Sequence, residues 1–203
     1  MLLAERLALL LLDPHSGTLR PHGALDAASL LAAALLADLV LAERVRARTG
    51  RLQCDGAMPL AHPLLMRAQQ ALGDRPLAPA QALDRVRRLP ALDVQVLDAL
   101  VRRDVLHRPA RWSLFARGMR RYPLRSQQAH ARVRDRFLRA AAAPDAEALA
   151  LLLLADAAGL SLQLDAAAHG ATLRHLARLD GESATGDSIT AALALLRRAL
   201  LDI

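Results

Sequence analysis

The sequence predicts a mainly α protein: a single globular helical domain over residues 1–203, with one or two short β-hairpins. Hydrophobic residues make up 54% of the chain, and Leu and Ala, which dominate them, are strong helix formers. Aromatic residues contribute only 2%, and β-branched residues are sparse, so the composition offers little support for strands. The 203 residues contain no internal repeat and no long linker, which fits one domain around one core.

The first half of the chain alternates apolar runs with residues that end or begin helices. Asp13-Pro14 ends the first run, and His15-Ser16-Gly17 predicts a turn. Thr49-Gly50 lies between the stretches 44–48 and 51–53 and predicts a short hairpin. The helices expected here are Leu2–Leu12, a helix capped by Asp26 and running to Leu41, a helix opened by Pro63 and running to Leu72, Ala80–Leu89 and Leu92–Arg103, with a loop at Gly73–Pro79.

The second half begins with a further predicted hairpin. Val105-Leu106-His107 forms its first strand, and Trp112-Ser113-Leu114-Phe115 returns after a turn. A basic loop, Gly118–Pro123, follows the hairpin. The helices expected beyond it run from Ser126 to Ala142, from Ala146 to Ala158, near Ala171–Leu179 and from Ser188 to Leu201, with a flexible loop at Gly181–Gly186.

The helix from Ser126 to Ala142 is predicted to be amphipathic. Ala129, Val133 and Phe137 recur every fourth residue and therefore share one face. Arg132, Arg136 and Arg139 lie on another face at helical spacing. We expect the first face to pack on the core and the second to carry positive charge.

The net charge of +7 is distributed unevenly. Twelve arginines lie between Arg102 and Arg139 against two acidic residues, Asp104 and Asp135, so this stretch carries +10. The rest of the chain holds 15 of the 27 basic and 18 of the 20 acidic residues, a net charge of −3. All basic residues are Arg, whose guanidinium group forks onto phosphate oxygens and stacks on aromatic rings. The sequence thus predicts a mildly acidic body with one strongly basic segment.

All four aromatic residues lie in the same basic segment, namely Trp112, Phe115, Tyr122 and Phe137. Arginine together with aromatic residues is typical of surfaces that anchor at a bilayer interface, and also of surfaces that bind single-stranded nucleic acid. The alternative is that Tyr122 and Phe137 belong to the core and the arginines form a solvated face. The residues predicted to contact an anionic membrane are Arg108, Arg111, Trp112, Leu114, Phe115, Arg117, Arg120 and Arg121.

Signals for catalysis, metal binding and membrane spanning are weak. The longest apolar stretches, Leu30–Ala42 and Ala148–Ala155, are shorter than the ~20 residues of a membrane-spanning helix. The seven histidines form no metal-binding motif, and no motif of a nucleophile or a phosphate-binding loop occurs. Gly186-Asp187-Ser188-Ile189 superficially resembles the nucleophile block of a lipase. It opens the last predicted helix, however, where Asp and Ser are ordinary capping residues. Cys54 is the sole cysteine, which fits a reducing compartment. We therefore expect no enzyme activity, no metal and no cofactor.

Several blocks of the sequence follow one another in a recognisable order. Each block alone is unspecific, but together they cover nearly the whole chain. They are Leu2–Asp13 followed by Ser16-Gly17, Leu35–Val45, Leu100–Leu106, Tyr122-Pro123-Leu124, Leu151–Leu164 and Ile189–Leu195. In this order the chain resembles the Golgi phosphoprotein 3-like family of helical, peripheral membrane proteins that carry a hairpin among their helices.

The resemblance implies binding of phosphoinositide headgroups, chiefly phosphatidylinositol 4-phosphate, and membrane contact through the hairpin of a cytoplasmic, peripherally membrane-associated protein. Family members that bind the headgroup carry a Trp and three Arg residues at four positions. By register these positions hold Gly23, Ala32, Pro90 and Asp93 here. The departure would suit a divergent bacterial relative whose membrane offers other anionic lipids.

Two other functions fit the same basic segment. The first is an adaptor that binds tails of membrane proteins, as the family resemblance implies, or that binds a second copy of itself through the hairpin. The second is a nucleic-acid binder that uses the hairpin together with Arg132, Arg136 and Arg139.

Overall fold

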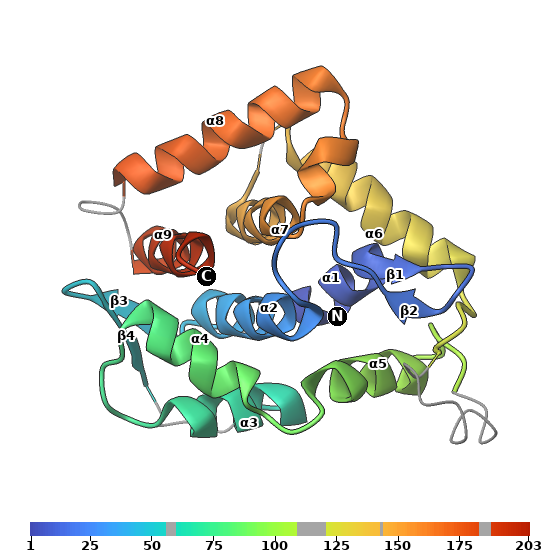
Figure 1. Cartoon of the computed structure of the whole chain (residues 1–203). Helices are drawn as coiled ribbons and strands as arrows, with labels where there is room; N and C mark the ends of the chain where they lie inside the picture. The colour runs from blue at the N-terminus through green and yellow to red at the C-terminus, as the bar shows by residue number, and fades with distance from the viewer. Residues whose placement is uncertain (56–59, 109–120, 143, 183–187) are drawn as a thin grey trace.

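The computed structural model describes residues 1–55, 60–108, 121–142, 144–182 and 188–203 (Figure 1). Within these ranges it contains nine α-helices and two small antiparallel sheets of two strands, which confirms the mainly α prediction. The elements in chain order are α1 Leu3–Leu11, β1 Leu12–Asp13, β2 Thr18–Leu19, α2 Ala27–Leu41, β3 Val45–Arg48, β4 Arg51–Cys54, α3 Pro63–Leu72, α4 Pro79–Arg87, α5 Leu92–Arg102, α6 Gln127–Ala140, α7 Ala146–Ala157, a 3₁₀ helix Leu160–Gln163, α8 Ala166–Glu182 and α9 Ser188–Leu201.

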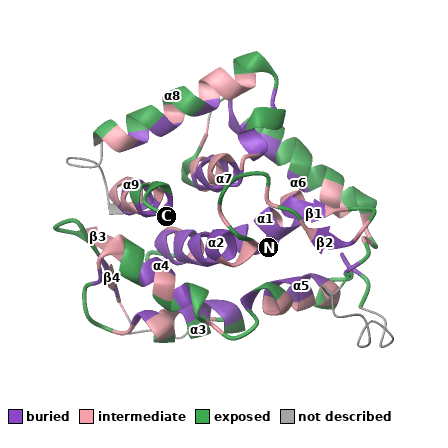
Figure 2. Ribbon diagram, viewed as in Figure 1, coloured by how far each residue is buried: buried purple, intermediate pink, exposed green. Residues whose placement is uncertain are grey.

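Helix α2 forms the centre of the core. It packs against α1, α3, α4, α5, α7 and α9, and Figure 2 shows it buried along nearly its whole length. Every residue from Leu30 to Ala37 is fully buried, because Ala and Leu occupy the entire circumference of the helix. Asp26 caps its first turn by accepting the Ser29 N–H at 2.7 Å, as predicted. In the described part of the chain, no helix combines the length and hydropathy that crossing a bilayer requires.

Helix α6 lies at the edge of the molecule and has the predicted amphipathic pattern. Its residues Val133 and Phe137 are buried, whereas Arg132 and Arg139 are exposed. Ser126 caps it by accepting the Ala129 N–H at 3.1 Å. The apolar face packs on α1 and α7, so the cationic face points to solvent.

The first predicted hairpin is confirmed as β3–β4. Arg48 pairs with Arg51 across a two-residue turn, in which Thr49 and Gly50 have φ values of 47° and 73°. Positive φ at both central residues is the pattern of a type I′ turn, which matches the twist of the strands. The turn carries Arg48 and Arg51 into solvent on the side of the molecule opposite α5 in Figure 1.

The predicted turn at His15–Gly17 also closes two short strands, β1 and β2, which the sequence did not indicate. Asp13 accepts the N–H groups of His15 and Ser16 and so fixes the turn. Gly17 has φ of 67°, and a Cβ there would lie 2.9 Å from the backbone of Tyr122. This close approach is held by the Tyr122 N–H, which donates to the Gly17 carbonyl at 2.7 Å. Only glycine fits this position.

The C-terminal part of the chain departs from the prediction in helix length. Helix α8 runs from Ala166 to Glu182, well beyond the predicted Ala171–Leu179, because Asp165 caps it by accepting the Ala168 N–H at 2.8 Å. Gly181 is therefore helical, although the sequence placed it in a loop. Residues 183–187 of that predicted loop lie outside the described residues.

One half-buried carboxylate joins the first two helices. Asp38 of α2 accepts the N–H groups of Leu3 at 2.8 Å and Ala4 at 3.2 Å, and so caps α1 from outside. Burial raises the pKa of Asp38 to about 7, in spite of these two donors, which favour the charged form. The folded protein thus keeps a proton on Asp38 at pH values at which the unfolded chain has lost it.

We therefore expect the contribution of Asp38 to stability to fall as the pH rises from about 4 to 7. Between these values the folded state binds more protons than the unfolded state, so the free energy of unfolding decreases with pH. The expected loss is on the order of 1 kcal/mol or more. Urea unfolding of wild type and Asp38→Asn at pH 5 and pH 7.5 measures it. The variant should lose less stability than wild type between these pH values. An equal loss in both proteins would contradict the raised pKa of Asp38.

Candidate functional site

The described residues on either side of residues 109–120 lie close together. Residues 109–120 belong to the basic segment defined by the sequence. Leu106 and Leu124 form an antiparallel bridge, and the His107 N–H donates to the Pro123 carbonyl at 2.8 Å. The chain therefore leaves and re-enters the body at neighbouring points beside the end of α5 (Figure 1). The partner of Leu106 in the described structure is Leu124, rather than a residue of the predicted return strand Trp112–Phe115.

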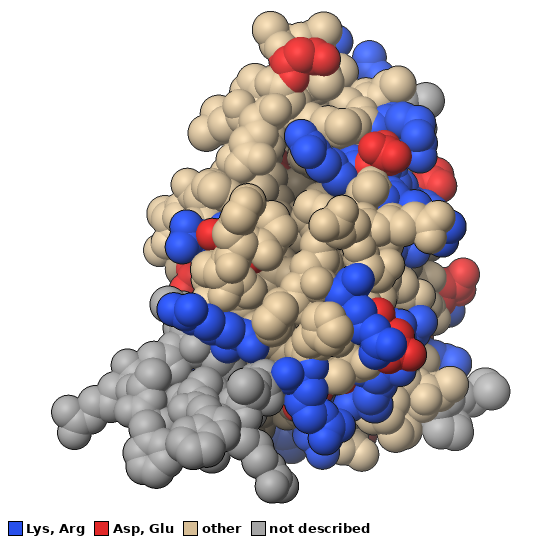
Figure 3. All heavy atoms as spheres, turned by 90° about the vertical axis from the view of Figure 1, so that its right-hand side faces the viewer, with Lys and Arg blue, Asp and Glu red and all other residues tan. Residues whose placement is uncertain are grey.

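Arginines surround this base, which consists of residues 102–108 and 121–125. Arg102, Arg103, Arg108, Arg121 and Arg125 are all exposed. Asp104 forms an ion pair with Arg125 at 2.5 Å, and Glu5 forms one with Arg103 at 3.3 Å, so two of the five charges are compensated. Figure 3 shows arginine side chains exposed on this side of the molecule. The base therefore presents a cationic surface to solvent.

The predicted membrane-contact residues are placed only in part. Arg108 and Arg121 lie at the two ends of the segment, and both are exposed. The other predicted residues lie outside the described residues. They are Arg111, Trp112, Leu114, Phe115, Arg117 and Arg120.

Two of the four aromatic residues belong to the core. Tyr122 is 1% exposed and Phe137 is 5% exposed. The Tyr122 hydroxyl donates to Asp98 at 3.1 Å, which satisfies its polar atom within the body. The alternative that Tyr122 and Phe137 belong to the core is thus confirmed. Trp112 and Phe115 remain as candidates for membrane contact.

The arginines of α6 are not all available to a ligand. Arg136 forms an ion pair with Glu147 of α7 at 2.7 Å, and Glu147 also pairs with Arg6 of α1. Arg136 therefore ties α6 to the body. Arg132 and Arg139 are exposed and form no ion pair with another described residue. This reduces the charge that the nucleic-acid hypothesis assigns to α6.

The four positions at which the family binds a headgroup do not form a common pocket here. Gly23 lies so close to α7 that a Cβ would be 2.9 Å from the Ala157 carbonyl oxygen, so no side chain fits. Ala32 is fully buried in the core, whereas Pro90 and Asp93 are exposed. None of the four lines the cavities between α3 and α5, between α1 and α6, or between α2 and α4.

The described residues differ in the chemistry that they make available to a ligand. Cys54 is buried, and burial raises the pKa of its thiol to about 11, so the reactive thiolate is scarce at neutral pH. No group of three His, Cys, Asp or Glu side chains in the described ranges is arranged to hold a metal ion. Exposed guanidinium groups are the chemically distinctive feature, and they are suited to binding phosphate and carboxylate groups.

One cluster of polar residues was not found in the sequence. Glu5 of α1 is fully buried and contacts Arg103 after α5 and His62 before α3. These residues are far apart in the chain and belong to no motif, so only the fold reveals their contact. The signal available in the sequence was the pair Glu5 and Arg6, which interrupts the apolar residues of the first helix.

Comparison with known protein families gives one match over most of the chain. The model of the family Golgi phosphoprotein 3 (GPP34) matches residues 3–200. This agrees with the resemblance found in the order of the sequence blocks. A search of curated proteins returned no match to the chain.

Proposed function

The chain belongs to the Golgi phosphoprotein 3 (GPP34) family, and from this premise we propose that it is a peripheral membrane protein that binds anionic lipid surfaces. We place the contact in the cationic base and, as the sequence predicts, in residues 109–120, which lie between the two parts of the base in the chain. The proposed role is one of binding at the cytoplasmic face of a membrane and requires no catalysis.

The proposal rests chiefly on the exposed arginines at the base. Each basic residue near an anionic membrane contributes roughly 1 kcal/mol, an attraction that falls off within a Debye length. Arg108 and Arg121 are exposed at the two ends of the segment, and five further arginines and aromatics of the predicted contact set lie between them in sequence, including Arg111 and Trp112. Such a set supports reversible docking that weakens as salt is added.

Charge, rather than a specific headgroup pocket, is the proposed basis of lipid recognition. The family resemblance implies phosphatidylinositol 4-phosphate, but Gly23 leaves no room for a Trp side chain and Ala32 is buried. We infer that docking through the base depends on the charge of the vesicle and not on a phosphatidylinositol 4-phosphate pocket at these positions.

Co-sedimentation with vesicles across a salt series tests this proposal. Three vesicle types are compared: neutral, generic anionic, and anionic with phosphatidylinositol 4-phosphate at matched charge. We expect similar binding to both anionic sets, no binding to the neutral set, and a decline with salt. A clear preference for the phosphoinositide would contradict charge-driven docking, and binding to neither anionic set would contradict the membrane role.

The family resemblance also implies a second class of partner, namely the tails of membrane proteins. Acidic tails would be attracted by the same exposed arginines, and so would an acidic surface of a second copy of the chain. Capture of such tails by wild type, and its loss when Arg108 and Arg121 are reversed to Glu, would support this adaptor role in addition to lipid binding.

A further inference from the structure

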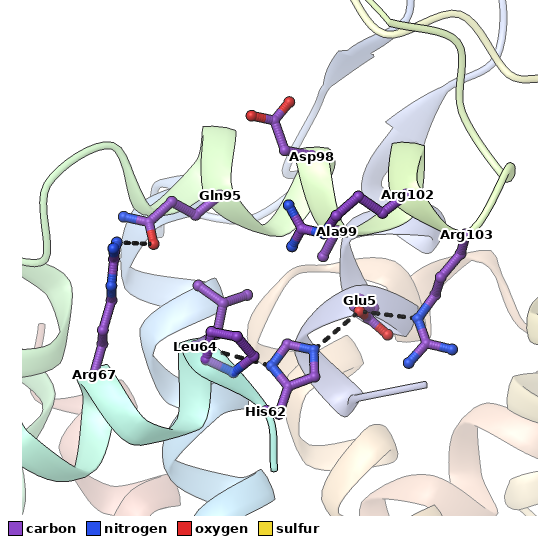
Figure 4. Close-up of a pocket in the computed structure, with 10 residues that line it drawn as sticks. Glu5, His62, Leu64, Arg67, Gln95, Asp98, Ala99, Arg102 and Arg103 are labelled. Atoms are coloured by element: carbon purple, nitrogen blue, oxygen red, sulfur yellow. Dashed lines mark hydrogen bonds and ion pairs between the residues drawn. The ribbon is translucent and has the colours of Figure 1, made fainter. Parts of the chain in front are cut away.

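A cavity of about 570 Å³ lies between α3, α5 and the start of α1 (Figure 4). This volume lies in the range of small-molecule sites in proteins. Its polar lining comes from three separate parts of the chain, including Glu5, His62, Arg67, Gln95, Arg102 and Arg103.

The floor of the cavity is a fully buried carboxylate that fixes two basic groups. Glu5 Oε1 lies 3.3 Å from Arg103 Nε and 3.6 Å from His62 Nε2. The Glu5 Oε2 atom accepts the Leu2 N–H at 2.9 Å, so both carboxylate oxygens are satisfied. Because a buried charge is costly unless it is paired, these contacts hold Arg103 and His62 in place beside the cavity. The negative charge of Glu5 is thereby compensated.

The orientation of the imidazole follows from a second contact. His62 Nδ1 accepts the Leu64 N–H at 3.3 Å, which leaves the ring proton of a neutral His62 on Nε2, facing Glu5. His62 is thus held from both sides.

Two further guanidinium groups lie on the other walls. Arg67 of α3 donates to Gln95 Oε1 at 2.7 Å, and Gln95 in turn donates to the Pro90 carbonyl at 2.6 Å. This chain of contacts orients Arg67 without neutralising its charge. Arg102 forms no ion pair with any described residue, and Figure 4 shows its side chain reaching back along α5 toward Ala99.

The second acidic side chain of the lining is turned away from the cavity. Figure 4 shows Asp98 pointing to the opposite side of α5 from Glu5 and His62. Its carboxylate accepts the hydroxyl of the buried Tyr122. The cavity is therefore faced by three guanidinium groups and by a single carboxylate, which is already paired.

We propose that this cavity is a binding site for a phosphoryl group, carried by a soluble phosphorylated compound or by a lipid headgroup. Guanidinium groups bind phosphate oxygens through charge-assisted hydrogen bonds, often in pairs. A phosphoryl dianion presents several oxygens in different directions and so suits arginines that approach from separate walls. Binding of a soluble phosphate here requires no membrane, and the site therefore goes beyond the proposed docking function.

Calorimetric titration with inorganic pyrophosphate, without lipid, tests the site. The test variant is Arg67→Gln/Arg102→Gln, which changes two exposed side chains and leaves the Glu5 network intact. The matched control is Arg48→Gln/Arg51→Gln, which removes the same charge from the exposed β3–β4 turn. We expect wild type and control to bind pyrophosphate equally, and the test variant to bind more weakly by roughly tenfold or more. No binding by wild type, or an equal loss in both variants, would overturn the proposal.

A vesicle arm separates the two sources of the phosphoryl group. Vesicles with phosphatidic acid, whose phosphate is exposed, are compared with phosphatidylserine vesicles of matched charge. A preference of wild type for phosphatidic acid that the test variant lacks identifies a lipid headgroup as the ligand. Pyrophosphate binding with no such preference identifies a soluble phosphate. If vesicles bind while pyrophosphate does not, the proposed membrane function stands and this site is overturned.

Discussion

Reversing Arg108 and Arg121 to Glu is expected to weaken binding to anionic vesicles by roughly 1,000-fold at low salt. Each arginine contributes about 1 kcal/mol near an anionic surface, and each reversal also adds a repulsion of similar size, so the total is about 4 kcal/mol. Both side chains are exposed, so the double variant should fold normally. The loss should shrink as salt is added, because screening reduces attraction and repulsion alike.

The matched control for this variant is Arg48→Glu/Arg51→Glu. It changes the net charge by the same amount, but on the β3–β4 turn, which lies across the molecule from the base in Figure 1. We expect this control to keep most of the vesicle binding in a co-sedimentation assay. Equal losses in the two variants would mean that net charge alone drives binding and that the base has no special role.

Gly159→Ala is expected to destabilise the protein by about 2–4 kcal/mol. Gly159 has φ of 75°, and a Cβ there would lie 2.8 Å from the His22 carbonyl carbon and from Gly23 N. The substitution therefore adds left-handed backbone strain to a clash with backbone atoms that cannot rotate away. The loop before α2 would be displaced, because the His22 N–H donates to the neighbouring Ala158 carbonyl at 2.9 Å.

Urea unfolding measures this effect, and Gly181→Ala provides the comparison. Gly181 lies in α8, and nothing lies within 4 Å of a Cβ built on it. Alanine should therefore stabilise the helix there by up to about 1 kcal/mol. If Gly159→Ala lowers the free energy of unfolding by less than about 1 kcal/mol, the contact of Gly159 with His22 and Gly23 relaxes readily, which would contradict this account.

Elements with local end signals could be predicted from the sequence. Helix α3 begins at Pro63 and helix α2 follows Asp26, as expected, because proline and aspartate act on the backbone within one turn. The Thr49-Gly50 turn is equally local. The N-terminal extension of α8 has the same kind of signal in Asp165, which the prediction of a helix near Ala171–Leu179 leaves out.

Features that depend on distant contacts could not be predicted. The β1–β2 pair is only two residues long on each side, and its turn is held against Tyr122, over a hundred residues away in the chain. The clustering of arginines near residues 102–139 was visible in the sequence, but their availability was not, since Arg136 proves to be tied to Glu147. The cavity floor joins Glu5 to His62 and Arg103, and no spacing rule links such positions.

The fluorescence of Trp112 offers the most direct test of membrane contact through residues 109–120. Trp112 is the sole tryptophan, so the signal comes from this segment alone. Titration with anionic vesicles should shift the emission to shorter wavelength, and brominated lipids should quench it, because an interfacial tryptophan leaves water for the headgroup region. Neutral vesicles should change neither. Vesicle binding that leaves the emission and the quenching of Trp112 unchanged would contradict contact through this segment.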